Sequence, residues 1–355
     1  MKKKKILIYK RKYKHNYGDL VLADCCRYLL YQAADICKTP IRVSVANVYE
    51  KFDFLIRLWL KNKDAVVYPG GGLNSAVFNE MLLHIFTFIE QREQIAVYFN
   101  AVGISRVKPK KKNIVLLKEL FNKPQVRQVT TRGDLAQMKK YISVPQPYPP
   151  RLVFDAAVWA GEAYGIQKDS ASQVIGIGVI NPDIYQRNGS EFSEEDVVAM
   201  YIGLIGELEK RGYEWQLFTN GLFGEYRFGL RILKMLRKSV RRHLGFHILS
   251  ARSLVKKISG YRAIIAARMH ANIIATSLDI PSVGLVWNDK MNLFAQMIGC
   301  EARYISVERM KDTSYIADVM ELAIKEGYDR ESMDAMKAAT METYCNIVTD
   351  NGRNL

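Results

Sequence analysis

The strongest chemical signal in the sequence is an Arg and a His that follow a short apolar run. Residues 263–266 predict a buried strand, and Arg268, Met269 and His270 come just after it. Arg presents a planar set of donors that fits phosphate or carboxylate, and His exchanges a proton near neutral pH. A helix expected from Ala271 would point its free amides at the same place. This combination predicts a site that binds a small anion and moves a proton.

A second candidate lies after the first predicted strand, in Asn16, Tyr17, Gly18 and Asp19. Gly18 allows a tight turn, and Asp19 can cap the helix that follows. The functional interpretation is that Asp19 lies in a cleft, where it orders a sugar hydroxyl or acts as a base.

A third candidate is the glycine triplet Gly70, Gly71 and Gly72, which follows the predicted strand at residues 65–68. Consecutive glycine amides can form an anion-binding nest. The triplet lacks the Gly-Lys-Ser/Thr ending of a P-loop and the spacing of a dinucleotide fingerprint. Close packing of the backbone is the alternative explanation.

Two further cations follow predicted strands. Arg132 comes after the strand at 126–130, and either points into a cleft or forms a surface pair with Asp134, which could cap the next helix. Lys290 comes after the strand at 282–286 and brings another positive charge toward Arg268 and His270.

Strand and helix patterns alternate along the 355 residues and restart after a polar stretch at 167–173. This alternation predicts an α/β fold with two Rossmann-like, doubly wound parallel sheets facing a cleft. We expect an N-terminal domain at 1–166 and a C-terminal domain at 167–355. The C-terminal helices could pack back on the first domain.

One predicted helix, at residues 224–243, is basic and amphipathic. Such a helix either lies on an anionic membrane surface or is a solvated outer helix of the domain. A strand is expected to follow it at Phe246–Leu249.

Charge and composition narrow the function classes. The net charge is +16, and residues 1–165 hold 28 Lys and Arg against 13 Asp and Glu. A basic half attracts phosphate, pyrophosphate or anionic lipid. Nucleic acid is the less favoured partner, because no recognised module is present and aromatic residues do not interleave with the basic runs.

The five Cys show no disulfide framework and no zinc-ligand spacing, so we expect no metal and a cytoplasmic location. The apolar stretch after the first lysines is too short for a signal peptide and is expected to be a strand.

In combination, these motifs resemble the polysaccharide pyruvyl transferase family. The resemblance rests on the Asn16–Asp19, Gly70–Gly72 and Thr131–Asp134 segments, on Val102-Gly103, and above all on the block from Arg268 through Ile280-Pro281 to Lys290. Family members usually have Arg-Asp-x-x-Ser where this chain has Arg-Gly-Asp-Leu-Ala from residue 132.

The resemblance implies a GT-B-like fold and transfer of the pyruvyl group of phosphoenolpyruvate to two sugar hydroxyls, which forms a cyclic ketal. It implies that Arg268 and His270 act in the donor site, and that no cofactor is needed besides the donor substrate. The domain at 1–166 is then the acceptor side, and the domain at 167–355 is the phosphoenolpyruvate side. The acceptor is expected to be a sugar linked to undecaprenyl pyrophosphate at the inner face of the membrane. The alternative is a GT-B-type sugar-nucleotide glycosyltransferase.

Overall fold

The computed structural model describes residues 2–11, 16–48, 58–73, 75–91, 95–104 and 110–351. The chain divides into two compact units, each built on one sheet. The first unit comprises Met1–Lys12, Leu22–Ala156 and Glu331–Leu355. The second comprises Tyr13–Val21 and Ala157–Arg330. The predicted α/β class is confirmed, since both sheets are parallel and helices lie between successive strands.

The sheet of the first unit has strand order β2-β1-β3-β5-β6-β7, and β4 pairs with β5. Its strands are β1 (Lys4–Arg11), β2 (Ile41–Val48), β3 (Ala65–Tyr68), β4 (Gly71–Gly72), β5 (Ala96–Gly103), β6 (Val126–Thr131) and β7 (Tyr148–Leu152). Its helices are α1 (Tyr17–Ile36), α3 (Ala76–Glu90), α4 (Lys111–Phe121), α5 (Leu135–Lys139) and α15 (Arg330–Thr349). The division between the units falls within α1.

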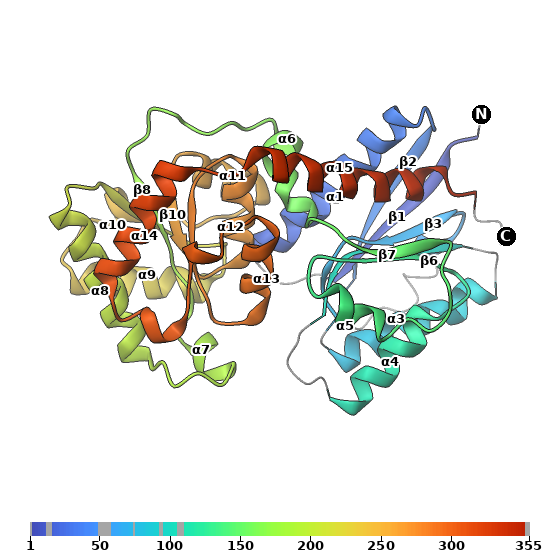
Figure 1. Ribbon diagram of the computed structural model, residues 1–355, viewed down its shortest axis with the longest axis horizontal. Helices are drawn as coiled ribbons and strands as arrows, with labels where there is room; N and C mark the ends of the chain where they lie inside the picture. Colours follow the sequence, from blue (N-terminus) through green and yellow to red (C-terminus); the bar gives the residue numbers. More distant parts are fainter. Residues whose placement is uncertain are drawn as a thin grey trace. The chain divides into compact units, whose positions relative to one another are not determined.

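Alternation along the strands creates two apolar faces of this sheet. Every second residue, such as Val97 and Phe99 of β5, packs with buried side chains of α3 and α4, including Phe86 and Phe121. Figure 1 shows α3 and α4 on one side of the sheet and α15 on the other. The sheet is therefore covered on both faces, as is usual for parallel strands.

Helix α15 is held on the first sheet by polar contacts as well as by packing. The Arg127 Nε donates to Asp350 Oδ2 at 2.9 Å, and both side chains are buried. The backbone N–H of Phe154 donates to Thr340 Oγ1 at 2.9 Å. The end of the chain thus completes the first unit, as the sequence analysis allowed.

The sheet of the second unit has strand order β12-β11-β10-β8-β9. Its strands are β8 (Ile175–Gly178), β9 (Trp215–Phe218), β10 (Ala263–Ala266), β11 (Ser282–Leu285) and β12 (Tyr304–Ile305). Its α-helices are α6 (Ala160–Tyr164), α7 (Asp183–Arg187), α8 (Glu194–Lys210), α9 (Phe223–Met235), α10 (Val240–His243), α11 (Ala251–Ser259), α12 (Met269–Ser277), α13 (Asp289–Met297) and α14 (Thr313–Glu326). Short 3-10 segments lie at Ala156–Trp159, Glu301–Arg303 and Val307–Arg309.

The predicted boundary at residue 166 differs from this division. Residues 157–166 group with the second sheet, because α6 contacts α11 and α12 and the Gly161 N–H donates to Ser277 Oγ at 3.3 Å. Residues 331–355 group with the first sheet through the contacts of α15.

Two local predictions in the second unit are wrong. The helix expected at 224–243 is split into α9 and α10, and Arg237 between them has a left-handed φ of 55°. The strand expected at Phe246–Leu249 is an irregular segment in which only Ile248 is buried. A strand at the core needs alternate buried positions, and this segment offers too few.

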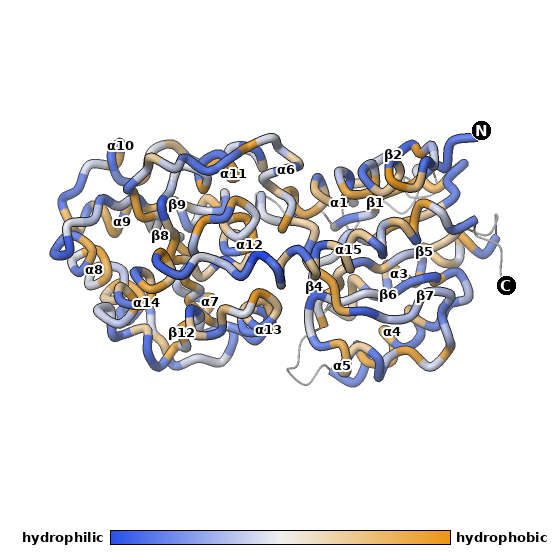
Figure 2. The backbone as a smooth tube through the Cα atoms, turned by 45° about the horizontal axis from the view of Figure 1, so that its top comes forward, coloured by the Kyte–Doolittle hydropathy of each residue, from blue (hydrophilic) through white to orange (hydrophobic). Residues whose placement is uncertain are grey.

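Hydrophobic and hydrophilic stretches alternate along the helices of each unit, as Figure 2 shows. This pattern is typical of helices that cover a sheet on one side and meet water on the other. No described helix is both long enough and apolar enough to cross a bilayer.

Candidate active site

The Arg and His of the strongest motif lie at the carboxyl end of β10. Arg268 is the residue before α12, and Met269 and His270 form the first turn of that helix. The Asn272 side-chain amide donates to the carbonyl oxygens of Ala266 at 3.0 Å and Arg268 at 3.1 Å, which fixes the turn between strand and helix. The carboxyl end of a parallel strand is where ligands bind in folds of this class.

His270 forms a pair with Asp19, which the sequence analysis did not anticipate. His270 Nδ1 lies 3.5 Å from Asp19 Oδ1, and His270 is only 9% exposed. Asn16 Nδ2 donates to the other carboxylate oxygen, Asp19 Oδ2, at 2.9 Å. Asp19 lies in the first turn of α1, which begins at Tyr17, so it is not the residue that precedes the helix. The carboxylate instead faces the imidazole, where it can orient the ring and stabilise its charged form.

Gly18 brings the Asn16–Asp19 segment against the imidazole. A Cβ atom at residue 18 would lie 2.6 Å from His270 Cβ, which is closer than packed side chains allow. The segment is also tied to the second sheet, since the Tyr17 N–H donates to the Asn220 carbonyl oxygen at 3.0 Å. Close approach, rather than a special backbone angle, thus requires glycine here.

Arg268 has a buried partner that the sequence analysis missed. Its Nε donates to Glu225 Oε1 at 2.6 Å, and its Nη2 also bonds to that oxygen. Glu225 lies in the first turn of α9 and is fully buried, while the Arg268 side chain keeps 18% of its surface exposed. None of the described residues bonds to Nη1, so the guanidinium is fixed on one side and retains a donor on the other.

Burial raises the pKa of Glu225, and the positive charge of Arg268 partly opposes that rise. The sequence contained one usable signal for this residue. Glu225 follows β9 by seven residues at the start of a predicted helix, and the carboxyl ends of all parallel strands of one sheet lie at the same edge.

Lys290 lies at the same edge, in the first turn of α13 after β11, and is half-buried. The two strand ends are joined by a hydrogen bond from Trp287 Nε1 to the Ala267 carbonyl oxygen at 2.7 Å. The structure therefore places Lys290, Arg268 and His270 after adjacent strands of one sheet.

The other predicted site residues belong to the first unit. Gly71 and Gly72 form β4, which pairs with Val102 and Gly103 at the end of β5. Gly70 has φ of 120°, and a Cβ there would meet the Ala101 carbonyl oxygen at 3.0 Å. The backbone of the triplet therefore packs closely against the end of β5, as the alternative explanation requires. Asn74, two residues after Gly72, lies outside the described residues.

Arg132 forms a buried ion pair, but its partner is Asp155 rather than Asp134. The Arg132 and Asp155 side chains are 7% and 0% exposed, so this is not the surface pair considered from the sequence. Asp134 instead caps α5, where its Oδ1 accepts from the Gln137 N–H at 2.9 Å. Asp155 gave no sequence signal beyond its place after β7.

Among the described residues, no group of three or more His, Cys, Asp or Glu side chains is arranged to hold a metal ion.

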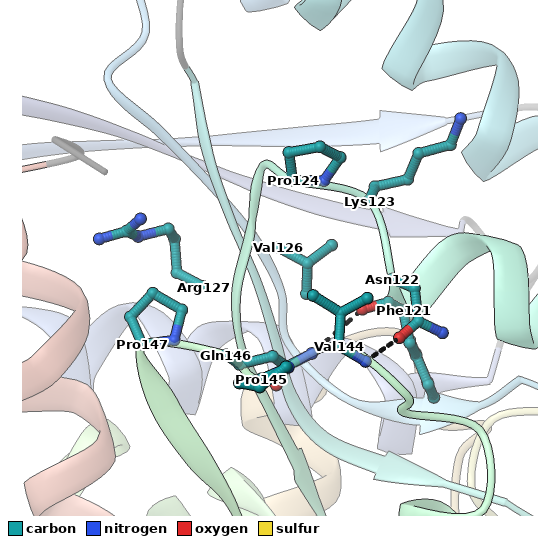
Figure 3. Close-up of a pocket in the computed structure, with 10 residues that line it drawn as sticks. All are labelled: Phe121, Asn122, Lys123, Pro124, Val126, Arg127, Val144, Pro145, Gln146 and Pro147. Carbon is teal, nitrogen blue, oxygen red and sulfur yellow. Dashed lines mark hydrogen bonds between the residues drawn. The ribbon is translucent and has the colours of Figure 1, made fainter. Parts of the chain in front are cut away.

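A pocket of about 470 Å³ in the first unit lies away from these residues (Figure 3). It is bordered by Val126 and Arg127 at the start of β6 and by Pro147 just before β7. Arg132 follows the opposite end of β6. Since ligands of such folds bind at the carboxyl ends of strands, this pocket is not the candidate active site.

The fold resembles solved sugar-nucleotide enzymes at low sequence identity. The UDP-GlcNAc 2-epimerase of Methanocaldococcus jannaschii aligns with 96% of this chain and 99% of its own, at 11% identity and a TM-score of 0.60. The UDP-GlcNAc 2-epimerase of Neisseria meningitidis, bound to UDP-GlcNAc, aligns with 90% of this chain and 98% of its own, at 13% identity and a TM-score of 0.50. These similarities show a GT-B fold.

Sequence comparison gives the more specific result. None of the curated proteins matches the chain significantly. The model of the polysaccharide pyruvyl transferase family matches residues 16–289, from the Asn that bonds to Asp19 to the residue before Lys290. That span covers well over half of the chain and includes the Arg268–Glu225 and His270–Asp19 pairs. It shows that this protein belongs to the polysaccharide pyruvyl transferase family and is a transferase.

Proposed function

We propose that the protein transfers the pyruvyl group of phosphoenolpyruvate to two hydroxyls of a sugar in a surface-polysaccharide precursor, which forms a cyclic ketal and releases phosphate. The observation that carries the proposal is the arrangement at one sheet edge of the second unit. There, Arg268 with its buried partner Glu225 and His270 with its partner Asp19 lie directly after β10. Such a site can bind an anion and deliver a proton in the same step.

The reaction requires one proton at carbon. A sugar hydroxyl attacks C2 of the enolpyruvyl group, and the methylene carbon C3 gains a proton and becomes a methyl group. A second hydroxyl then bonds to C2 as the C2–O bond to phosphate breaks. Of the two hydroxyl protons, one replaces the proton delivered to C3 and the other leaves with phosphate.

We assign the C3 proton to His270. Asp19 faces Nδ1, so it holds the proton on that nitrogen and leaves Nε2 to exchange protons with substrate. Asp19 then acts through the imidazole, as the group that orients it and stabilises its charge. Asn16 holds the carboxylate from the other side.

Phosphoenolpyruvate carries a phosphate and a carboxylate, so its site needs two fixed cations. Arg268 supplies one through the donor that Glu225 does not engage. We assign Lys290 as the other, because it follows the adjacent strand β11 in the same unit. Arg132 is less suited, because Asp155 already pairs with it and its side chain is only 7% exposed.

We assign the acceptor to the first unit, because residues 1–165 carry nearly all of the net positive charge. A lipid-linked sugar pyrophosphate at the inner face of a membrane is an acceptor whose negative charge is attracted to this positive unit. Peripheral contact with an anionic membrane would bring the protein to such an acceptor.

The test is His270→Ala, with His84→Ala on the exposed side of α3 as the matched control. Loss of a general acid lowers turnover by about 10²- to 10⁴-fold. We expect that loss in phosphate release from phosphoenolpyruvate, with the melting temperature unchanged, and normal rates for the control. Near-normal release by the His270 variant would refute the assignment.

A sugar-nucleotide glycosyltransferase is the second candidate, because the structural neighbours include UDP-GlcNAc enzymes. A ligand that binds only the folded protein raises its melting temperature. We expect phosphoenolpyruvate to do so and UDP-GlcNAc not to. The opposite result would favour the glycosyltransferase.

A further inference from the structure

The outer side of α9 and the segment that follows α10 carry exposed apolar side chains together with exposed cations. The apolar members are Phe223, Phe246 and Leu249, which are 61%, 97% and 73% exposed. The cationic members are Arg227, Lys234, Arg237 and Arg241, all exposed. We call these seven residues the α9 surface. Exposed apolar side chains that lie together, unlike scattered single ones, mark an interaction site.

Ring contacts bring the apolar members together. The His247 ring lies 5.9 Å from the Phe223 ring and 5.1 Å from the Tyr226 ring, between ring centroids. The Tyr226 hydroxyl also donates to the Gly245 carbonyl oxygen at 3.0 Å. The segment that carries Phe246 and Leu249 is therefore held beside the first turn of α9, where Phe223 lies.

The cations continue from that turn along the helix. Phe223, Arg227 and Lys234 are separated by four and seven residues, which places them on one stripe of α9. Arg237 and Arg241 follow in the turn after α9 and in α10. The α9 surface is thus apolar at one end and basic along its length.

The four cations of the α9 surface differ from neighbouring cations in their ion pairing. Three other cations of the same region have carboxylate partners, namely Arg231 with Glu194, Lys238 with Glu209, and Arg242 with Glu214. Among the described residues, none forms an ion pair with the four cations of the α9 surface. Four unpaired positive charges also oppose self-association through this face, because like charges would meet across a two-fold axis.

We infer that the α9 surface docks on an anionic lipid bilayer, with Phe246 and Leu249 inserted at the headgroup level and the four cations over the lipid phosphates. Apolar tips flanked by unpaired Lys and Arg are the two signals that reversible membrane binding requires. This inference deepens the proposed function and rests on it for a membrane-borne acceptor. The same first turn of α9 carries Glu225 on its inner side, so the docking surface and the Arg268 site share one helical turn.

The experiment is flotation of the purified protein with vesicles of phosphatidylglycerol and phosphatidylcholine, at low and high salt. We expect salt-sensitive binding to these vesicles and little binding to pure phosphatidylcholine. The apolar variant Phe246→Ser/Leu249→Ser should bind about tenfold more weakly. The charge variant Arg227→Gln/Lys234→Gln/Arg237→Gln/Arg241→Gln should bind about a hundredfold more weakly.

The matched control is Leu322→Ser/Lys325→Gln, an exposed apolar–cation pair on α14 that should leave binding unchanged. Failure of the unmodified protein to float, or flotation of both surface variants at the control level, would overturn the inference. Vesicle binding needs no turnover, whereas phosphate release from phosphoenolpyruvate in the presence of a water-soluble acceptor sugar needs no vesicle. Measuring both on each variant therefore separates a failure of the docking surface from a failure of the proposed function.

Discussion

Each unit of the protein holds one Arg–carboxylate pair just beyond the carboxyl ends of its strands, and the two pairs differ in what surrounds them. In the first unit, Arg132 and Asp155 are both almost completely buried. In the second, Glu225 is buried but Arg268 keeps 18% of its side chain exposed. The second pair also lies beside the His270–Asp19 pair in sequence and at the same sheet edge. The same two groups can therefore stabilise a fold in one place and hold a ligand-binding cation in another.

The largest effect that would sharpen this comparison is expected from Asp155→Ala. This change leaves the Arg132 guanidinium buried without its carboxylate, and breaking a buried pair in this way costs about 3–5 kcal/mol. We expect the free energy of unfolding in urea to fall by that amount. Restoring part of it with Arg132→Leu in the same chain would confirm that the buried charge is the cause. A loss under about 1 kcal/mol would mean that the first pair is not structural.

The next largest effect is expected at Gly18, which packs against His270 beside the Arg268–Glu225 pair. Gly18→Ala would place a Cβ atom 2.6 Å from His270 Cβ, so the ring or the Asn16–Asp19 segment must move. Because a general acid acts only at hydrogen-bond distance, we expect turnover to fall by about 10- to 100-fold.

Gly206→Ala is the matched control for that variant. Gly206 lies within α8, and a Cβ there meets no atom within 4 Å. Removing a helical glycine stabilises a helix by up to about 1 kcal/mol, so this control should be active and slightly more stable. Equal activity of the two alanine variants would show that the position of His270 does not affect turnover.

Much of this arrangement could be predicted from the sequence because it depends on local order. The strand before Arg268 and the helix after it are encoded by adjacent residues, and the parallel sheet then fixes the edge at which they end. The prediction of the strand at Phe246–Leu249 failed because an apolar run alone does not distinguish a buried strand from a segment that exposes its side chains.

Local sequence patterns could not predict the ion pairs between residues that lie far apart in the sequence. Glu225 and Arg268 are 43 residues apart in the sequence. Asp19 and His270 are even farther apart, because the Asn16–Asp19 segment follows β1 whereas His270 follows β10. Asp134 illustrates the same limit, because the nearest carboxylate to Arg132 in sequence caps a helix while Asp155 forms the pair.

The smallest and most discriminating effect is expected from Glu225→Gln. The amide keeps the shape of the side chain and one acceptor for Arg268, but removes the charge that holds the guanidinium. We expect KM for phosphoenolpyruvate to rise about tenfold, with a smaller change in kcat, because Glu225 positions a binding group and touches no substrate. Asp155→Asn in the first unit should leave KM unchanged.

The pH dependence of KM distinguishes a positioning role of Glu225 from a purely structural role, which would not change KM with pH. Burial raises the pKa of Glu225, so this carboxyl binds a proton more readily in the folded protein than in the unfolded chain, and its ionisation lowers the stability of the fold above that pKa. At neutral pH the Gln variant should therefore melt near the normal temperature. In the unmodified protein, KM should rise as the pH falls through the pKa of Glu225, because protonation releases Arg268. The Gln variant should lack this rise, and an unchanged acid limb would show that Glu225 does not hold Arg268 for substrate.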